Sequence, residues 1–152
     1  MATAFSHTCI VARDVERLGA FYIDVFGCVV SGAERDLSGE WLERGTGLPG
    51  ARIRGIHLLV PGHGADGPTI EVFSVEGLEP AIASVVNRAG LMHIAFSVDD
   101  VAGTLDRIVA AGGEALGEVV EANVAGVGRA DFVYTRDPEG NIVELLGWKE
   151  RQ

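Results

Sequence analysis

The sequence predicts an α+β fold made of two βαβββ modules, and three repeated features lead to this prediction. Each half of the 152-residue chain opens on a short apolar run that contains a histidine, at 5–12 and at 91–98. Each opening run is followed by a helical pattern that starts behind an aspartate. Each half then closes on an apolar run that contains a glutamate, at 68–75 and at 141–148. Because self-similarity of this kind indicates a duplicated unit, we expect a single domain with three parts: module one at about 1–76, a linker at about 77–90 and module two at about 91–152.

Both predicted helices begin after an aspartate and end at glycine. Asp14 precedes 15–26, where apolar side chains recur at helical spacing and Gly27 follows as a stop. In the second half, one of the two aspartates at 99–100 precedes a helix that ends at the glycine pair 112–113. An aspartate side chain satisfies backbone N–H groups of the first turn, and glycine accepts the left-handed conformation that ends many helices. One face of each helix can therefore cover a sheet.

Three strands are predicted after each helix, at about 28–35, 53–60 and 68–75 in the first half and at about 115–121, 129–136 and 141–148 in the second. Turn-rich sequences at 61–67 and 137–140 join the last two strands of each half into hairpins. Segment 36–52 is too interrupted by glycine for a regular element, and is either a substrate loop or a plain surface connection. Residues 76–90 join the modules and contain a short helical pattern at 80–86.

The composition limits the class of partner. Twelve basic against twenty-two acidic residues give a net charge of −10, which argues against a nucleic-acid or anionic-membrane surface. No apolar segment reaches the roughly 20 residues that span a bilayer, and the first residues show no leader pattern, so we expect a cytoplasmic protein that binds a small molecule or another protein. Cys9 and Cys28 form no Cys-x-x-Cys pair, so we expect reduced cysteines rather than a disulfide framework or a cysteine-only zinc site.

Two histidines and two glutamates occupy equivalent positions of the duplicated unit. His7 and Glu71 lie on the first and last strands of module one, and His93 and Glu144 lie on those of module two. Strand alternation puts the most apolar set near His93 under the helix and leaves the histidine on the other, more polar face. A buried, unpaired glutamate there would cost several kcal/mol unless it were solvated, protonated or bound to a cation. A divalent metal site built by duplication would remove that cost.

The order of motifs resembles the vicinal oxygen chelate superfamily, the group of glyoxalases, bleomycin-resistance proteins and extradiol dioxygenases. The motifs span nearly the whole chain. They are the opening His7-Thr8-x-x-Val11-x-x-Asp14 with Phe21-Tyr22 and Gly27, the middle His93-Ile94-Ala95-Phe96-x-Val98-Asp99-Asp100, and the closing Asp137-Pro138-x-Gly140-Asn141-x-x-Glu144-Leu145.

This resemblance implies a cupped mixed sheet with helices on its outer face, formed within one chain or by exchange between two, and we expect a homodimer. It implies one divalent metal ion per site, with nickel, cobalt, zinc, manganese and iron not distinguished. Carried over by position, the ligands are His7, Glu71, His93 and Glu144. Members with four such ligands include the glyoxalases, so the implied function is a metal-dependent lyase or isomerase of the glyoxalase or epimerase type. It would act on a small oxygenated substrate through a metal-stabilised enolate. Glu144 is the first and Glu71 the second choice of general base.

Two other functions stay open at this point. One is a metal-free resistance protein that sequesters a drug in the same cup. The other is an extradiol-type dioxygenase, which uses two His and one Glu on iron, so Glu71 would be surplus. Val11 stands where glutathione-dependent glyoxalases typically have a cationic residue, which argues against recognition of anionic glutathione.

Further polar residues lie on the strands before the closing turns. His57 is either a substrate contact or proton shuttle, or a hydrogen-bonded strand histidine. On the strand at 129–136, alternation puts Tyr134 with Phe132 on one face and Arg129 with Asp131 on the other.

Overall fold

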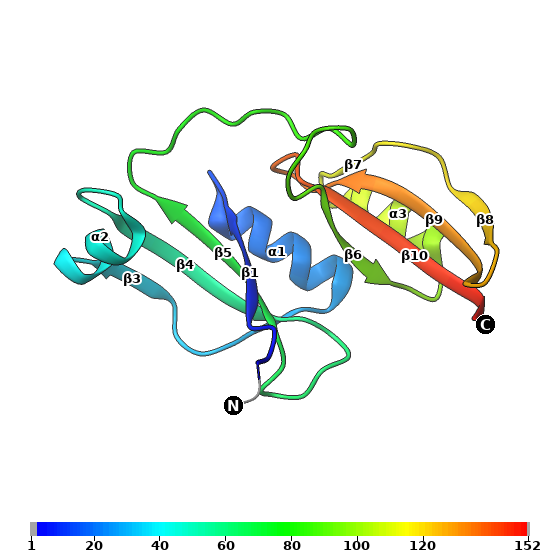
Figure 1. Ribbon diagram of the computed structural model, residues 1–152, viewed down its shortest axis with the longest axis horizontal. Coiled ribbons are helices and arrows are strands. Elements are labelled where there is room, and N and C mark those ends of the chain that lie inside the picture. The colour runs from blue at the N-terminus through cyan, green and yellow to red at the C-terminus, as the bar shows by residue number, and fades with distance from the viewer. Residues whose placement is uncertain (1–2, 152) are drawn as a thin grey trace. The chain divides into compact units, whose positions relative to one another are not determined.

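The computed structural model describes residues 3–151, which fold as two compact units, unit 1 running to Pro80 and unit 2 beginning at Ala81. Each unit contains one five-stranded mixed sheet (Figure 1). With the three helices of the described residues, the two sheets form the α+β fold that the sequence predicts. No helix within residues 3–151 is long and apolar enough to cross a membrane.

Unit 1 contains five strands and two helices. They are β1 (His7–Val11), α1 (Val15–Phe26), β2 (Val29–Val30), β3 (Arg35–Ser38), α2 (Glu40–Thr46), β4 (Arg52–Leu59) and β5 (Thr69–Val75). The strand order is β1-β5-β4-β2, and β3 also pairs with β4. β1 is parallel to β5 and the other pairs are antiparallel. The first and last strands of the unit are therefore neighbours in the sheet.

Helix α1 has the predicted boundaries. The Asp14 carboxylate accepts a hydrogen bond from the backbone N–H of Arg17 at 2.9 Å, and Gly27 ends the helix at φ 72°. Leu18 and Tyr22 are fully buried, so the apolar face of α1 packs on the sheet as the spacing predicts. In Figure 1, β1 crosses in front of this helix.

The prediction that 36–52 contains no regular element is wrong. The segment carries most of β3 and all of the helix α2. Gly39 precedes α2 and Gly47 ends it at φ 72°, so two of the glycines that suggested an irregular chain are helix boundaries. Leu42 is buried and holds the short helix in place. The predicted strand at 28–35 shortens to the two residues of β2.

Unit 2 contains β6 (His93–Ser97), α3 (Val101–Ala110), β7 (Glu114–Ala115), β8 (Val120–Val124), β9 (Gly128–Arg136) and β10 (Ile142–Arg151). The strand order is β6-β10-β9-β7, with β8 also paired to β9. β6 is parallel to β10, whereas β9 and β10 are antiparallel. The predicted strand at 115–121 is divided between β7 and β8. The helical pattern at 80–86 does not form a helix.

Local sequence signals fix the ends of α3 and of the closing hairpin. Asp100, one of the two predicted caps, accepts a hydrogen bond from the backbone N–H of Gly103 at 2.9 Å. In the turn between β9 and β10, the buried Asp137 carboxylate accepts hydrogen bonds from the backbone N–H groups of Glu139 and Asn141 and from the Asn141 amide. This turn therefore sets where β10 begins and which of its residues face each side.

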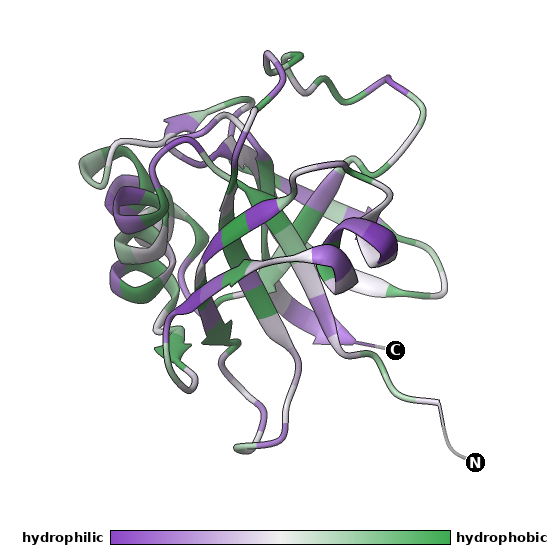
Figure 2. Ribbon diagram, turned by 90° about the vertical axis from the view of Figure 1, so that its left-hand side faces the viewer, coloured by the Kyte–Doolittle hydropathy of each residue, from purple (hydrophilic) through white to green (hydrophobic). Residues whose placement is uncertain are grey.

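Strand alternation separates each sheet into a helix-covered face and a second face. Hydrophobic and hydrophilic residues are interleaved along the strands (Figure 2). Val72 in unit 1 and Val143 and Leu145 in unit 2 are fully buried on the helix-covered faces. Glu71 and Glu144 occupy the alternate positions on the same strands and therefore point to the second face.

Candidate functional site

In unit 1, His7 and Glu71 lie beside each other on the second face of the sheet. β1 and β5 are adjacent parallel strands, with Cys9 opposite Glu71. The Nδ1 atom of His7 lies 3.5 Å from Oε1 of Glu71. The Glu71 side chain is only 12% exposed, whereas that of His7 is 45% exposed. The structure therefore brings together the two residues that the sequence singled out in this half.

Two further side chains contact Glu71. His57 is directly opposite Glu71 in the β4–β5 pair, and its Nε2 atom lies 3.5 Å from the same carboxylate oxygen, Oε1. The Cys9 thiol hydrogen-bonds the Glu71 carboxylate. Although residue Cys9 is exposed overall, desolvation of its thiol, together with the Glu71 charge, raises the pKa of the thiol to about 11. Cys9 therefore stays protonated near neutral pH and can donate to the carboxylate.

In unit 2, His93 and Glu144 form the equivalent pair. β6 and β10 are adjacent parallel strands, and Nε2 of His93 lies 3.0 Å from Oε2 of Glu144. Both side chains are largely covered, at 25% and 17% exposure. Nδ1 of His93 is buried and has no hydrogen-bond partner among residues 3–151. The pair therefore has the same composition and the same strand origin as the pair in unit 1.

Tyr134 occupies the position in unit 2 that His57 occupies in unit 1, because it is directly opposite Glu144 in the β9–β10 pair. Its ring lies 5.2 Å from the His93 ring and 5.9 Å from that of Phe132. Desolvation and the nearby Glu144 charge raise the pKa of the Tyr134 hydroxyl, which keeps the phenol neutral. Alternation correctly predicts that Tyr134 and Phe132 share a face.

Among residues 3–151, no permanently charged counterion lies against either glutamate. Within the described part of the chain, the ion-pair contacts of Glu71 are with His7 and His57, and that of Glu144 is with His93. Neither carboxylate meets a Lys or Arg there. A covered carboxylate whose neighbours are imidazoles is suited to a bound cation, because that cation would offset the cost of removing the charge from water.

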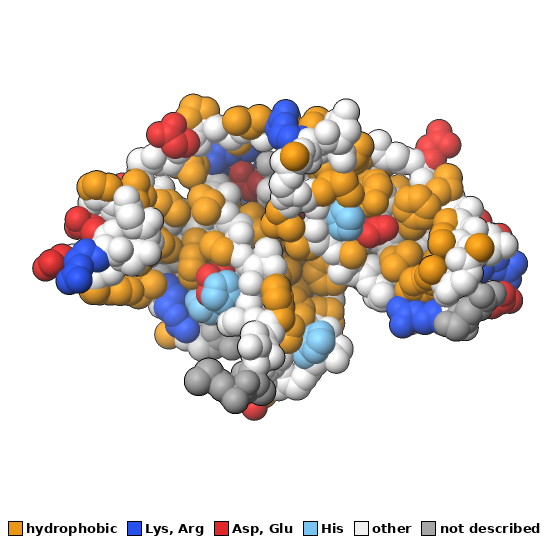
Figure 3. Space-filling model, viewed as in Figure 1, with side chains coloured by type: hydrophobic (Ala, Val, Ile, Leu, Met, Phe, Trp, Pro, Cys, Tyr) orange, Lys and Arg blue, Asp and Glu red, His pale blue; other side chains and the backbone are white. Residues whose placement is uncertain are grey.

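The donor chemistry fits a divalent transition metal, since imidazole nitrogen and carboxylate oxygen are ligands of zinc, manganese, nickel, cobalt and iron. Each unit by itself offers one such pair from its first and last strands. Across residues 3–151, no group of three or more His, Cys, Asp or Glu side chains is arranged so as to hold an ion. In Figure 3, histidine side chains lie beside acidic ones at two places in a largely hydrophobic surface.

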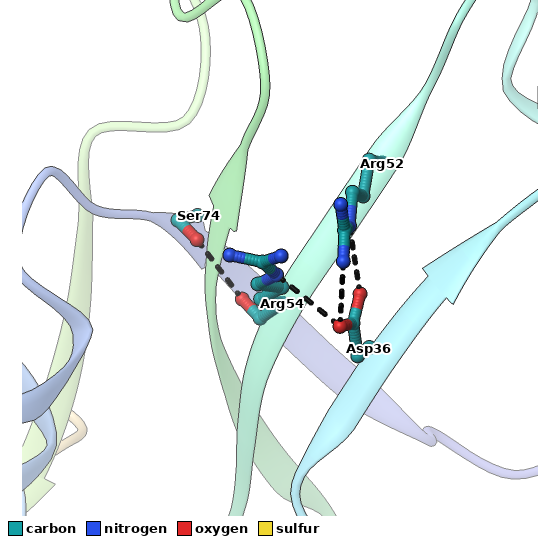
Figure 4. A network of polar contacts seen from close by, with 4 residues as sticks. All are labelled: Asp36, Arg52, Arg54 and Ser74. Carbon is teal, nitrogen blue, oxygen red and sulfur yellow. Dashed lines mark hydrogen bonds and ion pairs between the residues drawn. The ribbon is translucent and has the colours of Figure 1, made fainter.

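A second polar cluster in unit 1 lies on the opposite face of the sheet from Glu71. Asp36 on β3 binds the Arg52 guanidinium through two hydrogen bonds, of 3.0 and 2.9 Å, and contacts Arg54 at 3.3 Å (Figure 4). The Ser74 hydroxyl donates to the backbone carbonyl of Arg54 at 3.4 Å. An open groove of about 200 Å³ runs beside the arginines and is lined by Arg52, Arg54, Ser74, Val75 and Glu76. Asp36 links β3 to β4 through both arginines, and the cluster lies on the other face of the sheet from the His–Glu pair.

The sequence profile of the Glyoxalase/Bleomycin resistance protein/Dioxygenase superfamily matches residues 4–145. The match spans most of the chain, and the chain belongs to this superfamily. No curated protein matches the sequence.

Several solved structures share the fold of this chain. A glyoxalase family protein from Bacillus cereus is 24% identical, with a TM-score of 0.80, and the match covers 97% of this chain and 95% of that one. The fosfomycin resistance protein FosX from Listeria monocytogenes is 22% identical over 97% of this chain and 94% of its own, with a TM-score of 0.59. A further FosX structure, complexed with Mn(II) and a sulfate ion, is 17% identical over 97% and 93%, with a TM-score of 0.54. At these identities the likeness establishes the glyoxalase-like fold.

Sequence reasoning left the place of His57 open, and the structure puts it against Glu71. The predicted hairpin of the last two strands already indicated that a residue of the hairpin's first strand would face Glu71. Once the turn at 61–67 pairs β4 with β5, the residue facing Glu71 is fixed by register, and that residue is His57. The length of the turn could not be translated into a register from sequence alone, because its seven residues allow several.

Proposed function

We propose that this protein is a divalent-metal-dependent lyase or isomerase of the glyoxalase or epimerase type that acts on a small oxygenated substrate. One observation carries the proposal. In both units a histidine and a glutamate from the first and last strands lie side by side, at 3.5 Å in unit 1 and 3.0 Å in unit 2, without a Lys or Arg as counterion among the described residues. A metal site shared by the two halves would need each half to contribute such a pair of ligands, and duplication repeats the pair in both.

The proposed ligands are His7, Glu71, His93 and Glu144, which would together hold one divalent ion per site. When bound, such an ion acts as a Lewis acid on a substrate carbonyl oxygen and acidifies the adjacent C–H. A structure of FosX, a member of the same fold, is complexed with Mn(II), which supports a divalent metal in this chain. The proposal includes a homodimer that acts in the cytoplasm.

Glu144 is the proposed general base and Glu71 the second choice. His57 and Cys9 would continue to hold Glu71 when His7 is a ligand, whereas Glu144 faces only the neutral phenol of Tyr134 once His93 is a ligand. A carboxylate with fewer fixed contacts is freer to turn towards a C–H and accept its proton. His7 and His93 remain ligands throughout.

Proton exchange in heavy water tests the reaction class before the natural substrate is known. The metal-loaded protein would be incubated with 2-hydroxycarbonyl compounds, hemithioacetals and 2-substituted acyl thioesters, and the proton next to the carbonyl followed by NMR. We expect metal-dependent exchange or conversion in at least one class, lost in Glu144→Gln. Unchanged turnover in Glu144→Gln would contradict the proposed role.

Two other outcomes would identify a different function. Tight binding of an aromatic antibiotic by the metal-free protein, without proton exchange on any compound, would indicate a sequestering resistance protein. Oxygen consumption with ferrous iron and a catechol would indicate a dioxygenase.

A further inference from the structure

We propose that His57 is a positioning residue that orients Glu71 for metal binding, an inference that rests on the proposed function. The imidazole approaches the carboxylate from the strand opposite to that of His7, so Glu71 Oε1 lies between two histidines on β1 and β4. His7 reaches this oxygen from one side and His57 from the other, each at 3.5 Å. Together with the Cys9 thiol, His57 therefore limits the rotation of the Glu71 carboxylate.

His57 is itself held in place. Its ring lies 5.4 Å from the ring of Phe73, which is only 7% exposed and belongs to the same face of the sheet. Phe73 can lie there because its cross-strand partner is Gly55. A Cβ on Gly55 would come within 2.6 Å of the Phe73 ring and within 2.0 Å of the backbone oxygen of Val72. The chain of contacts runs from Gly55 through Phe73 and His57 to Glu71.

Duplication did not preserve this support in unit 2. The position opposite Glu144 is Tyr134, and the residue beside Glu144 on the first strand is Ala95 in place of Cys9. Unit 1 thus offers a glutamate fixed by groups that are not themselves proposed ligands. Unit 2 offers a glutamate that is not fixed in this way. The inference assigns Glu71 to permanent ligation and leaves proton transfer to Glu144.

The expected size of the effect follows from other metal sites. Side chains that orient a ligand typically contribute about 10- to 100-fold to metal affinity when they are removed. His57 is not among the proposed ligands, so its loss should weaken binding without abolishing it. A side chain that can still reach the carboxylate with an N–H donor should preserve most of the affinity.

A matched pair of substitutions tests this inference on metal binding alone. His57→Gln keeps an amide N–H at nearly the reach of the imidazole Nε2, and His57→Asn carries the same amide one methylene shorter. His63→Ala, in the exposed turn between β4 and β5, is the control. The dissociation constant for Mn²⁺ or Zn²⁺ would be measured by competition with a chromophoric chelator. Circular dichroism and thermal melting of the metal-free proteins would verify the fold.

We expect His57→Asn to bind about 10- to 100-fold more weakly, and His57→Gln and His63→Ala to bind within about threefold of the unaltered protein. Equal affinity of the Asn and Gln variants, at the wild-type or at a common weakened value, would overturn the positioning role. Wild-type protein that binds no metal would overturn the proposed function and the inference with it. The two failures are therefore distinguishable.

Discussion

The two units use one architecture but surround equivalent glutamates with different side chains. Glu71 is contacted by His7, His57 and Cys9, whereas Glu144 is contacted by His93 and faces Tyr134. The parallel strand pair is the same in both, so the position of the His–Glu pair is set by the backbone. The residues opposite and beside each glutamate differ between the two units. A duplicated fold can therefore keep a His–Glu pair in each unit while the side chains around the two carboxylates differ.

The comparison is tested most strongly by removing each carboxylate charge in turn. Glu144→Gln should lower turnover by about 100- to 10,000-fold while the metal is retained, because proton transfer to a positioned base contributes a factor of that size. Glu71→Gln should act mainly by weakening metal binding. Turnover and metal content would be measured on both variants with a substrate found by proton exchange. A larger loss of turnover in metal-saturated Glu71→Gln than in Glu144→Gln would reverse the assigned roles.

The contact between Gly55 and the Phe73 ring belongs to unit 1. Gly55→Ala should reduce the free energy of unfolding by about 2–4 kcal/mol, since the added Cβ would meet the Val72 backbone oxygen and φ is +156°. Gly45→Ala is the matched control, because no atom lies within 4 Å of its Cβ position in α2. That substitution should stabilise the helix by up to about 1 kcal/mol. Urea unfolding monitored by circular dichroism would separate the two, and equal stability of both variants would refute the packing argument.

The helix caps are the feature in which the units should behave alike. Asp14→Ala and Asp100→Ala each remove one side-chain hydrogen bond of 2.9 Å to the first turn. Each should reduce stability by about 1 kcal/mol. Thermal denaturation would measure both losses. A cap that costs nothing in one unit would indicate that this helix is held by packing alone.

The outer ion pairs should give the smallest effect. The hydrogen bonds from Arg52, assisted by Arg54, lower the pKa of Asp36 to about 2. Because this pKa is below that of the unfolded chain, the stabilisation is complete above the ordinary carboxyl range and is lost as pH falls towards about 2. NMR titration should show this midpoint in the folded protein, and Arg52→Gln should move it upwards. An unchanged midpoint in that variant would show that the pair does not persist in solution.

In unit 2 the corresponding carboxylate is that of Glu121. The Lys149 ammonium lies 2.7 Å from it and lowers its pKa. Lys149→Gln should raise the pKa of Glu121 and leave that of Asp36 unchanged. The same NMR titration follows both carboxylates.

Local signals made most of the fold predictable. Asp14, Gly27 and Asp100 fix helix ends through contacts within a few residues, so α1 and α3 were placed correctly. The helix α2 was missed because glycines such as Gly39 and Gly47 are typical of loops as well as of helix ends. The burial of Leu42 distinguishes the two cases, and it is known only from the structure. Burial depends on what packs against a segment, which a single sequence does not contain.

The candidate site was predictable as residue types but not as contacts. Alternation placed His93 on the face away from the helix, and the parallel pairing of β6 with β10 brings its Nε2 atom to 3.0 Å from Oε2 of Glu144. The contact between His57 and Glu71 required the register of β4 on β5, which depends on the conformation of a seven-residue turn. That the four proposed ligands bind one ion remains a prediction.

Metal content per protomer tests the central claim most directly. Elemental analysis would be made on untagged protein purified without chelators, alongside His7→Ala and His93→Ala. The account predicts about one divalent transition-metal ion per protomer in the wild type, lost in either variant, because the proposed ligand set includes both histidines. No uptake on reconstitution, or full occupancy in a variant lacking one histidine, would contradict it.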